Sequence, residues 1–177
     1  MTPDELAARA RALIASDRLT APTRAALAAR LDWRAGRPTV LSERQMAGLR
    51  AVAARLVPLG ALADRVDPAG RLETALARGG GDGWRYAAMP PDVDAVAAGL
   101  DALDAAGFLD AADSDRDRLL EAVQVGIAVW PVPSPLWFEE VLGQLVQLTY
   151  AHPLMQVAIG YDGMADADGW PMGHAQA

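Results

Sequence analysis

The chain of 177 residues contains no cysteine and no lysine, and only two of its residues are histidines. Without cysteine it can form no disulfide, no thiolate nucleophile and no sulfur-ligated metal site. Without lysine it cannot carry a nucleotide-binding P-loop. All 16 basic residues are therefore arginines. Arginine pairs with carboxylates in planar, bidentate geometry, which makes charge pairing within the chain worth examining.

The charges are divided unevenly along the chain. Residues 1–85 hold 14 arginines and nine acidic residues, whereas residues 86–177 hold two arginines and 14 acidic residues. One interpretation is that the two halves attract each other within one fold. The other is that the second half presents an acidic face to a partner. A pI near 4.7 argues against nucleic acid as that partner.

Neither a membrane span nor a leader sequence is recognisable. The longest apolar stretch, 123–132, is interrupted and far too short to cross a bilayer. Asp4 and Glu5 occupy the place where a signal peptide has its positive region. We therefore expect a cytoplasmic protein. A periplasmic location stays open if a leader was removed or if the chain is exported together with a partner.

Helix start signals are clear in two places. Thr2 and Ser42 each stand three residues before a Glu or Gln, which is the spacing of a capping box. Leu41 and Met46 flank the second cap at the positions of a hydrophobic staple. Alanine and leucine, both strong helix formers, dominate the apolar fraction. These features favour an all-α fold.

Apolar residues at helical spacing, together with caps, glycines and prolines, predict the helices. The expected ranges are 3–17, 22–31, 43–57, 68–77, 93–103, 114–123 and 135–150, with Asp92 as the cap of the fifth and Ser134 as the cap of the last. The last helix is apolar around most of its circumference and should be central. The prediction is one all-α domain over 1–177, a bundle of about six to seven helices, with 161–177 an extended tail.

Several motifs resemble ligand sites and fail on inspection. The glycine run 79–83 lacks the pattern of a dinucleotide-binding loop and is expected to be a turn. Asp166-x-Asp168-Gly169 lacks the first and last ligands of a calcium loop. Asp162, Asp166 and Asp168 are therefore interpreted as a solvated or interfacial charge cluster. No catalytic, cofactor-binding or metal-binding residue is predicted in this chain.

His152 and the tryptophans have alternative interpretations. His152 follows the most apolar helix, so we expect it to cap that helix at its carboxyl end. A catalytic role would need a partner that the sequence does not nominate. Trp137 is a core residue by periodicity. Trp84 and Trp170 lie beside glycines in loops, where each could plug its own core or anchor an interface.

Three stretches together resemble one known family. They are 41–58, 81–86 with 89–92, and a carboxyl-terminal set of 152–154, 159–163, 165–166 and 169–170. In this order they resemble the gluconate 2-dehydrogenase subunit 3 family, over about residues 41–172. That family supplies small subunits of flavin-dependent sugar and sugar-acid dehydrogenases.

The resemblance implies a non-catalytic helical subunit, without a cofactor of its own, bound to a large FAD-containing oxidoreductase of the glucose-methanol-choline type. Some members of the family also work with a cytochrome c subunit. Many carry a twin-arginine leader, which this sequence lacks. The residues expected at the partner interface are the loop aromatics and their acidic neighbour, namely Trp84, Tyr86, Tyr161, Asp162 and Trp170.

Two other functions stay open at this point. One is a free-standing helical enzyme that uses carboxylates such as Asp162 or Asp166 as acid and base. The other is a helical scaffold or binding protein without a redox partner. A subunit should co-purify with a yellow flavoprotein, whereas a free-standing enzyme should need no partner.

Overall fold

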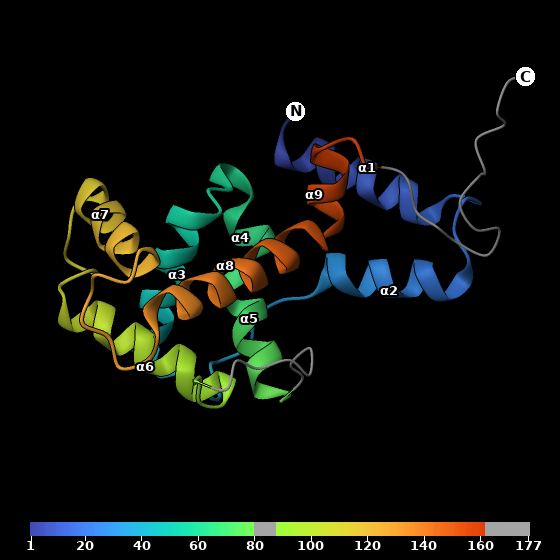
Figure 1. Cartoon of the computed structure of the whole chain (residues 1–177). Coiled ribbons are helices and arrows are strands. Elements are labelled where there is room, and N and C mark those ends of the chain that lie inside the picture. The colour runs from blue at the N-terminus through green and yellow to red at the C-terminus, as the bar shows by residue number, and fades with distance from the viewer. Residues whose placement is uncertain (80–87, 162–177) are drawn as a thin grey trace, which may run out of the picture. The chain divides into compact units, whose positions relative to one another are not determined.

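A computed structural model describes residues 1–79 and 88–161 (Figure 1). Within these ranges the regular structure is helical and contains no strand, so the predicted all-α class is confirmed. The backbone contacts divide the chain into two compact units. Among the described residues, the first consists of 1–34 and 150–161, and the second of 35–79 and 88–149.

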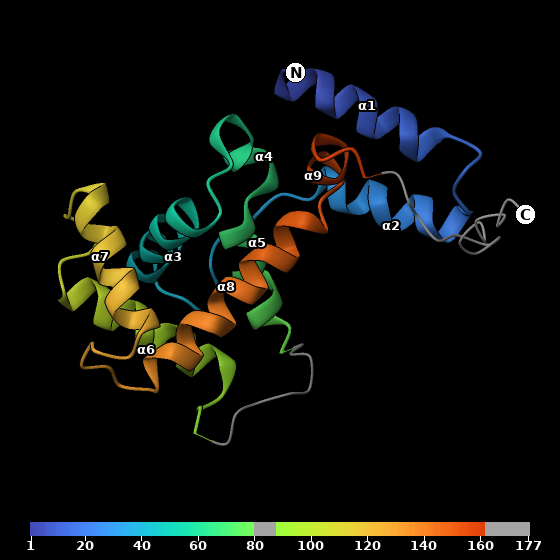
Figure 2. The same cartoon turned by 45° about the horizontal axis from the view of Figure 1, so that its top comes forward.

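In the first unit, α1 (Pro3–Ala15) packs against both α2 (Ala21–Asp32) and the short α9 (Pro153–Ala158) (Figures 1 and 2). The capping box of α1 is present, because Thr2 Oγ1 accepts from Glu5 N and Glu5 accepts from Thr2 N at 2.7 Å. The buried apolar residues recur at helical spacing, and they are Leu6, Ala10, Ile14, Leu27, Leu31, Leu154 and Met155.

The second unit contains the remaining helices. They are α3 (Glu43–Leu56), η1 (Gly60–Leu62), α4 (Ala63–Val66), α5 (Pro68–Ala77), α6 (Asp92–Ala105), α7 (Asp113–Gln124) and α8 (Ser134–Tyr150), whose last residue belongs to the first unit. The central element by contact is α3, which packs against α5, α6 and α7. Leu41 and Met46, which were expected to form a hydrophobic staple, are both buried in the same cluster.

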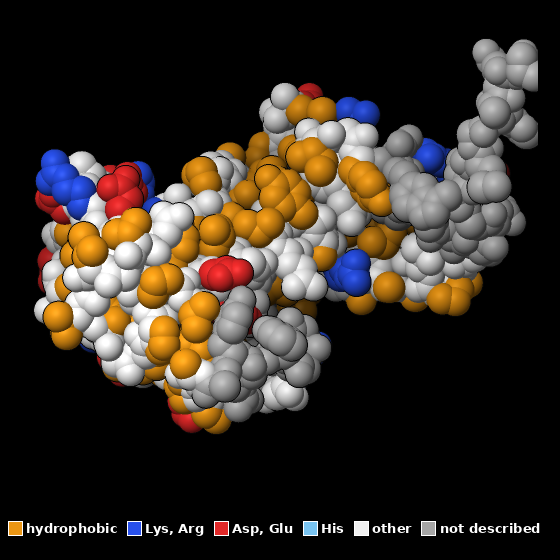
Figure 3. Space-filling view, in the orientation of Figure 1, with side chains coloured by type: hydrophobic (Ala, Val, Ile, Leu, Met, Phe, Trp, Pro, Cys, Tyr) orange, Lys and Arg blue, Asp and Glu red, His pale blue; other side chains and the backbone are white. Residues whose placement is uncertain are grey.

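Arginines of α3 tie this helix to α6 and α7. Arg55 forms a bidentate pair with Asp117, in which both N···O distances are 2.7 Å. It also donates a hydrogen bond to Asp113 at 2.8 Å. The hydrogen bonds from Arg55 hold the pKa of Asp117 below its ordinary value. Arg44 forms a similar pair with Asp104. Figure 3 shows acidic and basic side chains gathered over α7. Here the basic and acidic halves of the sequence do attract each other within one unit.

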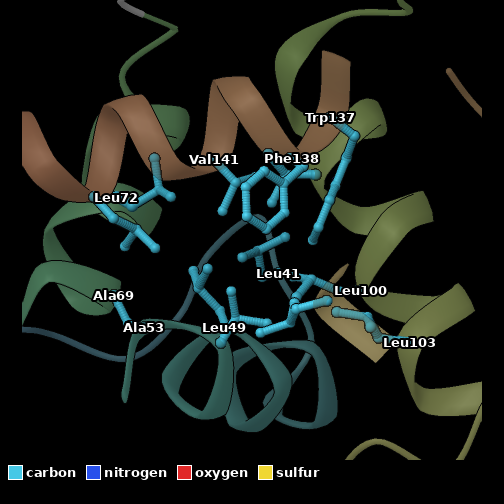
Figure 4. Packing of buried hydrophobic residues seen from close by; sticks show 14 of the residues in the cluster. Leu41, Leu49, Ala53, Ala69, Leu72, Leu100, Leu103, Trp137, Phe138 and Val141 are labelled. Carbon is cyan, nitrogen blue, oxygen red and sulfur yellow. The ribbon is translucent and has the colours of Figure 1, made fainter. Parts of the chain in front are cut away.

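The core of the second unit lies between α8 and the helices around α3 (Figure 4). Trp137, Phe138, Val141 and Leu145 of α8 recur at three- and four-residue spacing and are all buried. In Figure 4 the side chains of Phe138 and Val141 point from α8 toward α3. All four residues belong to one buried cluster with Leu49 of α3 and Leu100 of α6. The sequence predicted α8 as a central helix. It contributes these four buried side chains to the core, while its opposite side, at Glu139, Gly143 and Val146, is exposed.

A buried carboxylate fixes the segment that leads into α3. Glu73 of α5 accepts hydrogen bonds from the backbone N–H groups of Thr39 and Val40, the latter at 3.0 Å, and from the Thr39 hydroxyl at 3.2 Å. Burial alone would raise the pKa of Glu73, but the hydrogen bonds outweigh it and leave the pKa lowered. The charged form of Glu73 therefore stabilises this connection.

The structure corrects four local predictions. Asp92 is the first residue of α6, and Pro91 holds the cap position without a side-chain hydrogen bond. Ser134 is likewise the first residue of α8 and does not precede it as a cap. The helices α4 and α9 were not predicted. With four and six residues respectively they are too short to show an apolar period. The break between α4 and α5 occurs at Asp67, whose backbone is left-handed at φ 43° and whose carboxylate caps α5.

Candidate partner interface

Of the five residues predicted for the interface, the structure describes Tyr161. It follows α9 and is 42% exposed. Trp84, Tyr86, Asp162 and Trp170 lie outside the described residues, and so does the predicted tail beyond Tyr161. The structure therefore places one member of the predicted set on the surface.

The position of Tyr161 is set by the way α9 ends. Gly160 has a left-handed backbone at φ +71°. Its N–H donates to the Val157 carbonyl at 3.1 Å, and the N–H of Tyr161 donates to the Gln156 carbonyl at 2.8 Å. This pair of bonds is a Schellman motif, which requires glycine or a similarly permissive residue at its left-handed position. Gly160 and Tyr161 belong to the carboxyl-terminal set of stretches that resembles the known family. The Schellman motif explains why a glycine precedes the tyrosine there.

His152 caps a helix, but not the helix that was expected. Its side chain is 1% exposed, and its Nδ1 accepts a hydrogen bond from the Leu154 N–H at 3.1 Å. This makes His152 the amino-terminal cap of α9. The prediction that it caps the carboxyl end of α8 is wrong, because the chain turns at once into the unpredicted α9. His152 lies beneath the surface as a structural residue of this turn.

An exposed apolar surface also lies outside the five residues predicted for the interface. Val125, Ile127 and Val129, in the connection between α7 and α8, are 65%, 77% and 101% exposed. We call these three residues the α7–α8 patch. Single exposed aliphatic residues are ordinary on protein surfaces, whereas a group of them often marks a binding site. The patch is therefore the candidate partner interface of the second unit.

The backbone of the patch is fixed by a second Schellman motif. Gly126 has φ +77°, its N–H donates to the Val123 carbonyl at 3.2 Å, and the N–H of Ile127 donates to Ala122 at 3.1 Å. The residue in the position of Ile127 commonly packs back on its own helix.

The matching motif at the end of α6 shows this usual arrangement. There Phe108 follows the left-handed Gly107, donates to Leu103 at 3.0 Å and is completely buried. Ile127 occupies the same place in its motif and is exposed. The comparison shows that the Schellman geometry does not by itself expose the side chain, so the exposure of Ile127 is a particular feature of this connection.

The connection is also joined to the core beneath it. Trp130 stacks at a tilt on the buried Trp137, with ring centroids 5.7 Å apart. A β-carbon built on Gly126 would lie 3.1 Å from Cγ of Pro135, at the beginning of α8. The patch therefore rests on packed neighbours. The patch has a visible sequence pattern. Between the end of α7 and Pro131, the β-branched residues Val125, Ile127 and Val129 alternate with the small residues Gly126 and Ala128.

Residues 1–79 and 88–161 contain no group of three or more side chains placed to hold a metal ion. None of the helices in the described part of the chain is long and apolar enough to cross a membrane.

Comparison with known proteins gives no assignment. No family model, no curated protein and no solved structure matches the chain.

Proposed function

We propose that this protein is the non-catalytic accessory subunit of an FAD-dependent dehydrogenase complex, with a large subunit of the glucose-methanol-choline type as its partner. FAD belongs to that partner and a sugar or sugar acid is its substrate. A cytochrome c subunit is a further candidate component of the complex. The support from the sequence is the family resemblance over about residues 41–172.

The observation that carries the proposal is the exposed α7–α8 patch. Full burial of an aliphatic side chain of this size is worth about 1.5–3 kcal/mol. Three such side chains, 65–101% exposed on a connection joined to the core, offer a partner an apolar anchor. The partner surface that fits them is apolar, because charged groups would lose water there without gaining a partner.

The residues predicted from the sequence contribute further contacts in this proposal. Tyr161 lies on the surface of the first unit, and Asp162, Trp170, Trp84 and Tyr86 are assigned to the interface by sequence alone. Tyrosine and tryptophan are enriched among residues that dominate binding energy. Trp170→Ala should therefore weaken association by about 2 kcal/mol or more while leaving the isolated fold intact.

We expect a reading frame adjacent to this gene to encode a flavin oxidoreductase. The test is to co-express that protein with this chain and then to capture this chain by affinity. The expected result is a yellow complex with the absorbance bands of oxidised flavin. Ile127→Glu should reduce the captured flavin at least tenfold, because the charge would be buried against an apolar surface. Ala47→Glu, which adds the same charge to an exposed site on α3, should capture as much flavin as the unmodified chain.

The outcomes separate the parts of the proposal. If Ile127→Glu captures as much flavin as the unmodified chain, the α7–α8 patch is not the interface. If the unmodified chain captures no flavoprotein, the accessory-subunit function is wrong. Capture of a partner without flavin would favour the alternative of a helical scaffold without a redox partner.

A further inference from the structure

A cavity of about 240 Å³ lies in the first unit, beside α1 and α9. Its lining residues come from α1, the turn after it and the end of α9, and they are Arg9, Leu13, Arg18, Val157, Gly160 and Tyr161. All six belong to the same compact unit. The cavity is smaller than the 300–1,000 Å³ typical of sites for drug-sized ligands and cofactors. A ligand held here is therefore small, or is one side chain of a larger molecule.

The lining combines positive charge with hydrocarbon. Arg9 and Arg18 supply two guanidinium groups, Tyr161 supplies a phenol, and Leu13 and Val157 supply aliphatic surface. Among the described residues, the hydrogen bond of the Arg9 guanidinium goes to the thioether sulfur of Met1, at 3.6 Å. A thioether is a weak acceptor and cannot neutralise a guanidinium. The pocket thus contains a cation that has no carboxylate partner in the described part of the chain.

The wall formed by α9 is held in place. The Schellman motif that fixes Gly160 and Tyr161 closes the helix directly beside the cavity. Leu13 lies four residues after Arg9, so both side chains belong to one face of α1. The charged and apolar lining is therefore presented by α1, by α9 and by the residues that follow each of them, and the two helices pack against each other.

We propose that this pocket binds a carboxylate carried on a short apolar body. The carboxylate would accept charge-assisted hydrogen bonds from Arg9 and Arg18, and the hydrocarbon would lie on Leu13 and Val157. Such a carboxylate has two sources, a free small acid or an acidic residue of the segment that begins at Asp162. Both present the same chemistry to the same residues, and the experiment distinguishes them.

The test measures binding of hexanoate to the full chain by titration, following the amide resonances of Gly160 and Tyr161. Binding should be saturable and should weaken as salt is added, since these charges are partly screened. Arg9→Gln and Arg18→Gln should each weaken it at least tenfold. Arg11→Gln should leave it unchanged, because Arg11 is on the same helix but pairs with Asp32 at 2.8 Å and does not line the cavity.

The source of the carboxylate is distinguished by a second background, in which Asp162, Asp166 and Asp168 are all replaced by Asn. If a free acid is the occupant, hexanoate binds equally in both backgrounds. If the chain's own acidic segment is the occupant, hexanoate binds more tightly when that segment is neutralised. If hexanoate binds in neither background, or if Arg9→Gln and Arg11→Gln act alike, the proposal is overturned. Flavin capture plays no part in these outcomes, so the result is independent of the proposed function.

Discussion

The indole of Trp137 on α8 lies directly over Gly99 of α6. A β-carbon built on Gly99 would be 2.1 Å from the indole Nε1 and 2.2 Å from Cε2. Trp137 is 1% exposed and Gly99 is buried as well, so the ring has little room to withdraw. A glycine within a helix normally costs stability, and here it permits the close approach of the largest side chain in the core.

Gly99→Ala should destabilise the protein by about 1–3 kcal/mol, the usual cost of overpacking a core. The measurement is the free energy of unfolding by denaturant. Gly143→Ala is the matched control, because Gly143 also lies within a helix but has no neighbouring atom within 4 Å of the added carbon. It should stabilise the protein by about 0.5–1 kcal/mol. If Gly99→Ala leaves the free energy of unfolding unchanged, the close approach of Trp137 to Gly99 is contradicted.

Glu73 should make stability depend on pH. Its folded pKa lies below the ordinary value of 4.5, because the hydrogen bonds from Thr39, Val40 and Leu41 outweigh the effect of burial. A lowered folded pKa contributes stability above about pH 4.5, and this contribution is lost as the pH falls through the lowered value.

The comparison that tests this is Glu73→Gln against the unmodified chain. At pH 7 the substitution should cost about 1–3 kcal/mol, because it weakens bonds to a buried charged acceptor. The difference between the two proteins should shrink when denaturant unfolding is repeated at successively lower pH, because the carboxylate of the unmodified chain becomes protonated as the pH falls through its lowered pKa. A difference that is independent of pH would show that the charge of Glu73 contributes nothing.

His152→Ala should lower the thermal midpoint, since it removes the acceptor for the Leu154 N–H and part of the buried packing. The loss of a cap costs about 1 kcal/mol. Asn is a good cap residue and offers a side-chain oxygen in place of Nδ1. His152→Asn should therefore recover part of the loss. If Asn is as damaging as Ala, the imidazole acts by packing and not as a cap.

Gly160→Ala should cost about 1–2 kcal/mol, because the left-handed backbone is unfavourable for a residue with a β-carbon. No neighbouring atom lies within 4 Å of that carbon, so the strain would come from the backbone alone. Gly36→Ala is the control, with equally open surroundings and no left-handed φ. Thermal unfolding of the two variants tests the comparison, and equal midpoints would argue against the Schellman motif at this position.

The sequence alone determined the helical class and the longer helices. Capping at Thr2 and Ser42 is local, since each cap bonds residues three positions away, and the apolar stripe of α8 is equally visible in the chain order. The burial of Trp137 followed from that stripe. These features depend on neighbours in sequence, which is why they could be predicted without the fold.

Only the tertiary structure decided the features that depend on distant neighbours. The nearness of Gly99 to Trp137, the bond between Glu73 and the segment before α3, and the pairing of Arg55 with Asp117 each join residues more than 30 positions apart. The exposure of Ile127 and the burial of Phe108 were also undecided by sequence, since both follow a glycine at a helix end. Local geometry is the same in the two motifs, and the packing around each one decides which side chain is left for a partner.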